Sequence, residues 1–438
     1  MKTGKILICK LVTIGVLLTV SASVAGQQYE KVFRHNFKAE NNAKVIILNY
    51  DTDLEIMTWN KPQVELHMII DATINDPDDA ELLDSYLESI EYESTPDQIN
   101  LDTKFWESIN SIMGITRMKL KNNQTIRIKK FDMECKLWIP ENASLGLKSR
   151  YSDINMENIG GNLVLELYDD ELLAANVKGK ANIEAKYSEM NFTGMNDIEA
   201  DLYNCELSTG DAGDINIHTK YSKIHSGNAG TINIDSYEDD FSFDSCGDIK
   251  FIAKYSEFTT GKAGKLVADN YECEFMAESV SDAKIDSKYS EFIITSANSI
   301  DISSSYEDLF ETKMLGSLMV KETKYGEYDF GRLEDNLTIE SGYEDEISVD
   351  MLGRNIELLK INGRYLDIDF AIASDFECRF EASIKHYNFD IDEDMFRIKK
   401  HIKDGNELLY VGFKGTEKDG MPQLRITGYE VNLSISEY

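Results

Sequence analysis

The 438-residue sequence has only five prolines and six cysteines, and it lacks the motifs that mark most enzymes. So few prolines leave little room for stiff proline-rich linkers between domains. The cysteines are widely spaced and include no CxxC pair, which excludes a disulfide framework and the common zinc sites. The six histidines form no HExxH pair, and no GxSxG, Walker or dinucleotide-binding motif is present. We therefore expect a protein that is not an enzyme.

Positive charge is also scarce. The chain carries 45 basic and 79 acidic residues, which gives a formal net charge of −34. Such a surface repels nucleic acid and anionic lipid, and it suits cations or basic partners. High acidity can indicate disorder, but 42% hydrophobic and 10% aromatic residues argue for a packed core. We expect a folded protein with no nucleic-acid partner.

Only one long apolar run occurs, from Leu11 to Val20. Three lysines precede it, and Ser23 and Ala25 supply the small residues of a cleavage site. This pattern is typical of a signal peptide, and the run is shorter than the roughly 20 residues that span a bilayer. We therefore predict a signal peptide over residues 1–25, export to the periplasm or outer cell surface, and no transmembrane helix in the mature chain.

A repeat of about 17 residues fills the middle of the chain. We number the first residue of each repeat zero, so that the first repeat starts at Leu145 and the tenth at Ile300. Offsets zero, two and nine are apolar in all ten repeats, which chance does not explain in a chain that is 42% hydrophobic. Two short strands and their turns cannot bury a face alone, so the repeats must stack as rungs. A propeller is excluded because its blades need about 40 residues.

These patterns predict an all-β fold, a β-solenoid of about 17-residue rungs with a small α/β cap at the N-terminus. In the cap, strands are expected at Lys44–Leu48 and Val64–Ile70, and a helix from Pro77 to Ile90. The basic run Phe396–Lys403 is expected to be a solvated loop, and Gln423–Ile435 a strand that closes the C-terminal end. The predicted domains are a cap at 26–140, a solenoid at 141–400 and a C-terminal strand cap at 401–438.

Stacking at about 4.8 Å places residues of equal offset in columns along the solenoid. At offset five, lysine alternates with tyrosine, while offset six carries tyrosine in the rungs whose offset five is basic. We expect each cation to lie between tyrosines, with cation–π contacts worth ~0.5–1 kcal/mol at each exposed pair. We predict a structural role for this Lys–Tyr ladder. It consists of Lys186, Tyr203, Lys220, Tyr237, Lys254, Tyr271 and Lys288.

Offset eight is acidic in nine of the ten rungs, with Lys223 as the exception. Like charges directly opposite each other destabilise a sheet, so this acidic column needs an explanation. It is either a solvated face that keeps the protein soluble, or a row of carboxylates that collects a basic partner or a hard cation such as calcium. No EF-hand loop or RTX-type nonapeptide is present, and no cofactor is predicted beyond this calcium candidate. The candidate ligands are Glu189, Glu206, Asp240, Glu257, Glu274, Glu291 and Asp308.

Two motifs carry a resemblance to a known family. Thr58-Trp59-Asn60-Lys61 is similar to its "TW(D/N)K" turn, and Lys324-Tyr325-Gly326-Glu327 to its KYG-type repeat. The chain thus resembles the putative-adhesin β-solenoid family of bacterial envelope proteins, a domain of unknown function related to GIN-type adhesin heads. The resemblance implies a right-handed, single-stranded β-solenoid in the periplasm or at the cell surface, and it brings no catalytic residues.

Three hypotheses for the function remain open. The first is a non-catalytic, adhesin-like envelope protein whose acidic, laddered surface binds a ligand, a cation or a partner. The second is a β-helix carbohydrate-active enzyme with a site in the irregular rungs after Tyr306, where the repeat loses its regular length. The third is an envelope scaffold that self-associates end to end, which uncapped rungs would permit.

Overall fold

The computed structural model describes residues 27–112, 115–392 and 394–438. The predicted signal peptide, residues 1–25, lies outside this part of the chain. The described residues form two compact units. The smaller unit comprises residues 27–31, 70–90 and 105–132, and the larger comprises 32–69, 91–104 and 133–438. No helix within the described ranges has the length and hydropathy needed to cross a membrane.

The smaller unit contains the helix α1 (Pro77–Glu88), which lies where the sequence predicts one. Asp76 caps its N-terminus by accepting a hydrogen bond from the backbone of Asp78, and Leu83 and Leu87 are buried. The antiparallel strands β6 (Trp106–Ile112) and β7 (Ile115–Leu120) belong to the same unit. Three strands have residues in both units: β1 (Gln27–Lys38), β4 (Gln63–Ile74) and β8 (Thr125–Pro140).

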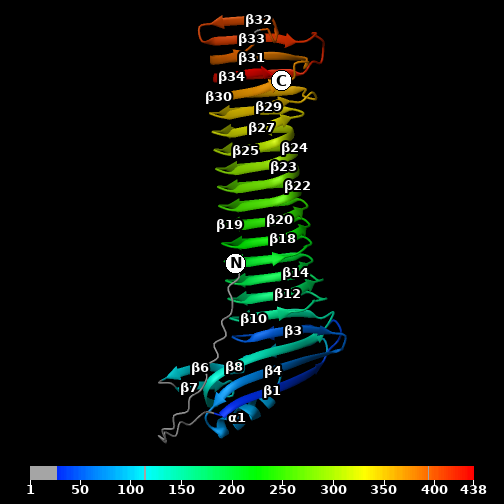
Figure 1. Cartoon of the computed structure of the whole chain (residues 1–438), viewed down its shortest axis with the longest axis vertical. Helices are drawn as coiled ribbons and strands as arrows, with labels where there is room; N and C mark the ends of the chain where they lie inside the picture. The colour runs from blue at the N-terminus through cyan, green and yellow to red at the C-terminus, as the bar shows by residue number, and fades with distance from the viewer. Residues whose placement is uncertain (1–26, 113–114, 393) are drawn as a thin grey trace, which may run out of the picture. The chain divides into compact units, whose positions relative to one another are not determined.

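The larger unit is a β-solenoid in which each rung adds one strand to each of two parallel stacks (Figure 1). The first stack begins with β5 (Gln98–Asp102), β2 (Lys44–Leu48), β9 (Ser144–Arg150), β11 (Leu163–Tyr168), β13 (Ala181–Lys186), β15 (Ile198–Tyr203), β17 (Ile215–Lys220), β19 (Ile232–Tyr237) and β21 (Ile249–Lys254). The second stack begins with β8 and continues through β3 (Asp53–Trp59), β10 (Asp153–Met156), β12 (Glu171–Val177), β14 (Glu189–Met195), β16 (Glu206–Thr209), β18 (Lys223–Ala229) and β20 (Asp240–Cys246).

Further along, longer strands contribute to both stacks: β22 (Glu257–Tyr271), β23 (Glu274–Lys288), β24 (Glu291–Tyr306), β25 (Leu309–Val320) and β30 (Leu358–Ile372). Among them lie shorter strands that belong to one stack each: β26 (Thr323–Lys324) and β28 (Leu337–Tyr343) in the first, and β27 (Glu327–Leu333) and β29 (Glu346–Leu352) in the second. The C-terminal elements are β31 (Cys378–Ile391), β32 (Arg397–Asp404), β33 (Glu407–Lys414) and β34 (Gln423–Glu437).

The register confirms the predicted repeat. Leu163 lies opposite Leu145 on one side and Ala181 on the other, which are steps of 18 residues, and later steps such as Ile215 to Ile232 are 17. The core between the stacks contains the aliphatic residues of offsets zero and two and a row of phenylalanines from the second stack. Phe258 and Phe275, on adjacent rungs, stack with ring centroids 5.2 Å apart.

The corner from the first stack to the second is a left-handed residue at offset six. Its φ is +57° at Tyr187, +58° at Tyr221 and +55° at Glu238, and similar values recur in the other rungs. Residues other than glycine, asparagine and aspartate rarely adopt this conformation. The corner therefore carries a small backbone strain that the packing of each rung must offset.

Directly after the corner, at offset seven, lies a buried polar column that the sequence analysis missed. The backbone N–H of Cys205 donates to Ser222 Oγ on the next rung (3.1 Å), and the N–H of Ser222 donates to Asp239 Oδ1 (2.7 Å). These side chains satisfy N–H groups that the corner leaves unpaired. Burial raises the pKa of Asp239, and it raises the pKa of Asp170 and of Asp345 to about 6.

Asp308 belongs to this buried column, so its assignment to the acidic column is wrong. Ser303 is an extra residue in β24, because Ile285 pairs with Ile302 while Asp286 pairs with Ser304. The bulge shifts all later residues of the rung by one offset. The Asp308 side chain accepts hydrogen bonds from Ser305 Oγ (2.7 Å) and from the backbone N–H of Ser290 (2.8 Å), and the residue is 2% exposed.

The two ends of the solenoid also differ from the sequence-based expectation. Strands β2 and β3 lie within the predicted cap, yet they pair in parallel with β9 and β10, so regular rungs begin at Lys44. At the other end β34 pairs with both β30 and β31 and forms an interior rung, so the prediction that it closes the end is wrong. The antiparallel strands β33 and β32 close this end, and the basic run is a strand rather than a loop.

Candidate functional site

The seven residues of the Lys–Tyr ladder lie in one column along the first stack. Lys186 pairs with Tyr203, Tyr203 with Lys220, and the alternation continues through Tyr271 to Lys288. The column then passes through Tyr306, Lys324, Tyr343 and Arg364 to Tyr429. Tyr306 takes offset five because of the bulge at Ser303, whereas the sequence frame put Ser305 there.

Tyrosines of offsets five and six join into one continuous row of rings along this corner. Fifteen rings follow one another from Tyr50 to Tyr429, with centroids 5.3–5.8 Å apart and planes 70–87° apart. Such edge-to-face pairs contribute about 0.5–1.5 kcal/mol each beyond burial. The offset-six rings, such as Tyr187, Tyr221 and Tyr255, keep 41–45% of their surface exposed.

The predicted cation–π contacts of the ladder lysines are absent among the described residues. Arg150, which occupies offset five of the first rung, does make such a contact, with its guanidinium 5.6 Å from the centroid of Tyr168. The tyrosine rings of neighbouring rungs meet each other edge to face. The offset-six acids act on the phenols instead: the pKa of Tyr271 is raised, first by its hydrogen bond to Glu272.

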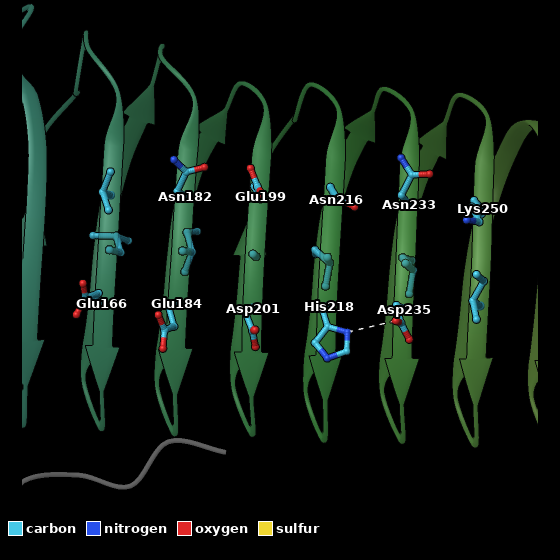
Figure 2. A pocket seen from close by; sticks show the side chains of 17 residues that line it. Glu166, Asn182, Glu184, Glu199, Asp201, Asn216, His218, Asn233, Asp235 and Lys250 are labelled. Carbon is cyan, nitrogen blue, oxygen red and sulfur yellow. Dashed lines mark ion pairs between the residues drawn. The ribbon is translucent and has the colours of Figure 1, made fainter.

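Beside the tyrosine row, the outward surface of the first stack is hollowed into a shallow depression of about 790 Å³. Figure 2 shows its side chains projecting from neighbouring parallel strands. Offset one supplies three amides, and offset three supplies carboxylates and one imidazole. His218 Nδ1 lies 3.5 Å from Asp235 Oδ2. The labelled residues are Glu166, Asn182, Glu184, Glu199, Asp201, Asn216, His218, Asn233, Asp235 and Lys250.

A second depression of about 480 Å³ connects this surface to the Lys–Tyr ladder. It shares His218, Asp235 and Ile252 with the first depression, and it extends to Tyr237 and Tyr271 of the tyrosine row. We call the combined surface the ladder face, defined as the outward side chains at offsets one, three and five from Val164 to Tyr271. Amides, carboxylates, lysines and aromatic rings thus repeat side by side along several rungs.

The acidic column of offset eight lies on the second stack. Glu189, Glu206, Lys223, Asp240, Glu257, Glu274 and Glu291 follow one another in register, and Leu309 takes the next position. Lys223 Nζ lies 3.9 Å from Asp240 Oδ2. Within the described ranges, no three or more His, Cys, Asp or Glu residues converge in a way that could hold a metal ion. The column's carboxylates line up along the stack and do not surround a common point, so the calcium candidate gains no support.

The irregular C-terminal rungs carry a different depression, of about 780 Å³. His386 adopts the left-handed corner conformation there (φ +55°), and its ring contacts Tyr429 with centroids 5.0 Å apart. Its Nδ1 lies 3.0 Å from Asn406 Nδ2. Asp367 and Glu430 line the same hollow, so this depression offers the enzyme hypothesis two carboxylates and one imidazole for acid–base chemistry.

Two solved structures show some similarity to the chain. One is described as a "putative cell adhesion protein from Clostridium sporogenes ATCC 15579"; it is 8% identical, with 94% of this chain and 100% of that chain covered and a TM-score of 0.17. The other is a "Putative lipid binding protein from Parabacteroides distasonis ATCC 8503", 12% identical, with 76% and 94% covered and a TM-score of 0.18. No protein-family model and no curated protein matches the chain. Such TM-scores carry no argument, so the function must be inferred from the surface of this chain.

Proposed function

We propose that this chain is an exported, adhesin-like protein of the bacterial envelope that binds an extended ligand along its ladder face without transforming it. The observation that carries the proposal is the continuous row of fifteen tyrosines beside two connected depressions. Tyrosine suits this use because its ring offers apolar area and its hydroxyl a hydrogen bond at low entropic cost.

The repetition of the ladder face favours binding over catalysis. A catalytic site needs one constellation of groups held in one geometry, whereas here the same groups recur from rung to rung. A ligand that spans several rungs meets several equivalent contacts at once, so its affinity rises with its length. The apolar run at residues 11–20 supports export, since it has the pattern of a signal peptide.

The two alternatives have narrower support. The enzyme hypothesis depends on the C-terminal depression around His386, Asp367 and Glu430. The end-to-end scaffold needs an open terminal rung, but β33 and β32 cover the C-terminal end. All eight residues of β32 are exposed, and four of them are arginine or lysine, a composition that discourages pairing with another strand.

The proposal is tested with a pair of matched variants of the mature chain. Asp201→Ala with Asp235→Ala removes two carboxylates from the ladder face, and Glu206→Ala with Asp240→Ala removes two from the same rungs on the second stack. Binding of labelled protein to fixed bacterial cells and to envelope extracts is then measured. We expect the ladder-face variant to bind about tenfold more weakly and the control to bind like the wild type. Equal binding by all three proteins would contradict the proposal.

A further inference from the structure

We infer that the ligand of the ladder face is a polysaccharide without acidic groups, either neutral or amine-bearing, which lies along the stacking direction with its sugar rings against the tyrosine row. This inference rests on the proposed function and adds the chemical class of the ligand. It follows from the amides, the aromatic row, the backbone of the stack and the charges of the face.

The amides match the hydroxyl groups of sugars. Asn182, Asn216 and Asn233 occupy offset one in three rungs, and within the described structure their exposed side chains make no hydrogen bond to the protein. An amide offers donors and an acceptor in one plane. Two residues further along the strand, Asn182 and Asn233 are followed by the carboxylates Glu184 and Asp235, which accept only, and Asn216 is followed by the imidazole of His218. A sugar hydroxyl both donates and accepts, so neighbouring hydroxyls can pair with such a set along the chain.

The tyrosine row supplies the apolar part of the site. A pyranose ring has faces of C–H groups, which pack against aromatic rings while the hydroxyls at the ring edge stay free for polar contacts. Tyr203 and Tyr221 are 38% and 43% exposed, so their rings are accessible beside the depressions. Because a ring recurs at every rung, with successive centroids 5.3–5.8 Å apart, a polymer finds such a contact along its whole length.

The backbone argues against a peptide as the ligand. An extended peptide binds to a sheet mainly by adding a strand to a free edge, where unpaired N–H and C=O groups offer main-chain hydrogen bonds. Strands β13 to β21 of the ladder face each pair in parallel with the rung before and the rung after. This face therefore offers side chains alone, which suits a ligand recognised through hydroxyl groups.

The charges of the face select among polysaccharides. The ladder face has a net negative charge, because its carboxylates outnumber its lysines by six to four, and the whole chain carries a net charge of −34. The carboxylates are Glu166, Glu184, Glu199, Asp201, Asp235 and Asp269, and the lysines are Lys186, Lys220, Lys250 and Lys254. A polyanion would meet this excess of carboxylates and be repelled. A neutral chain avoids the repulsion, and an amine-bearing chain gains attraction that salt would weaken.

The test measures the binding of three probes by affinity electrophoresis and calorimetry: mannan as a neutral polymer, chitosan as an amine-bearing one, and polygalacturonate as an acidic one. The amide variant carries Asn182→Ala, Asn216→Ala and Asn233→Ala. Its control carries Asn155→Ala, Asn191→Ala and Ser208→Ala, which are outward residues of the second stack. We expect mannan or chitosan to bind with an affinity that grows with chain length. The affinity should be about tenfold weaker for the amide variant and unchanged for its control.

Tight binding of polygalacturonate, or equal losses in both variants, would overturn the inference. The polysaccharide inference is also wrong if none of the three polymers binds while binding to envelope extracts still depends on Asp201 and Asp235. In that case the proposed function stands. If extract binding is also independent of these two carboxylates, both proposals fail.

Discussion

The ring of Tyr221 meets the ring of Tyr237 edge to face on the next rung, with centroids 5.7 Å apart and planes at 79°. Tyr221 makes a similar contact with Tyr203 on the preceding rung. The tyrosine row therefore links rungs on the outside of the solenoid, in parallel with the phenylalanine row inside it. This external row should contribute measurably to stability, although its members are half exposed.

Replacing Tyr221 tests that contribution. Tyr221→Ala removes two ring pairs and should lower the free energy of unfolding by about 1–3 kcal/mol. Tyr221→Phe keeps both rings and should cost only a few tenths of that. Thermal and urea unfolding of the whole chain measure the difference, and an equal loss in the two variants would show that the ring contacts do not stabilise the stack.

In the buried column at offset seven, removing a single hydroxyl group should lower the stability at least as much as removing a tyrosine ring from the row. Ser222→Ala leaves the backbone N–H of Cys205 buried without an acceptor, which should cost about 1–3 kcal/mol. Ser242→Ala is the control, because Ser242 points outward from β20. The two melting temperatures are compared directly, and a Ser222→Ala variant as stable as the control would mean that another group or a water accepts the N–H.

The buried carboxylates predict an unusual dependence of stability on pH. The pKa of Asp345 is raised by burial to about 6, whereas in the unfolded chain it is about 4. The folded state therefore binds more protons between these values, and this group's contribution to stability falls as pH rises from about 4 through 6. Asp345→Asn removes the titration. The difference in unfolding free energy between wild type and this variant should shift in favour of the wild type as pH falls from 7 to 5, and a constant difference would exclude the effect.

The left-handed corners predict a stabilising substitution. Glu238 has a φ of +55°, and at the equivalent position two rungs earlier Asn204 has a φ of +52°. Asparagine tolerates this conformation better than glutamate, so Glu238→Asn should stabilise the protein by up to about 1 kcal/mol. Glu257→Asn, in the extended strand β22, should give no gain because asparagine is unfavourable in strands. A rise in melting temperature for the first variant alone is the expected result.

The thiols should remain unpaired and react slowly. Cys205 and Cys273 are both buried and share offset seven four rungs apart, or about 19 Å at ~4.8 Å per rung. This separation is far beyond the reach of a disulfide. Burial raises the pKa of both thiols, so native-state labelling followed by mass mapping should modify them much more slowly than in urea. A crosslink between them within one monomer would contradict the register.

The regular rungs could be predicted because each one has to solve the same packing problem locally. Offsets zero, two and nine face the core in every rung, so apolar residues recur with the period of the rungs. Once that period is known, the alternation of lysine and tyrosine at offset five can be recognised. The bulge at Ser303 could not be predicted, because the extra residue leaves the apolar pattern of the rung intact. Its consequence is that Asp308 moves from the exposed column to the buried one. An apolar residue is expected at offset nine, and both Leu309 and Phe310 satisfy that pattern.

The ladder face was only partly visible in the sequence. The Lys–Tyr column could be identified from the sequence. The tyrosine row could not, because it depends on the distance between the ring at offset five of one rung and the ring at offset six of the next, and residue spacing does not determine that distance. The amides of offset one were missed because the sequence analysis considered carboxylates and rings and not Asn182, Asn216 and Asn233. Their recurrence at 34 and then 17 residues was the available signal.

The position of β34 has a consequence for how the chain can reach this structure. Strand β31 and the hairpin beyond it precede β34 in the sequence, yet β34 fills the space between β30 and β31. Until β34 inserts, two facing strand edges stay open, and each can template a strand of the same shape from elsewhere. A second molecule could donate its own β34 to that gap, so swapped dimers are the characteristic misfolding product to expect if insertion is slow.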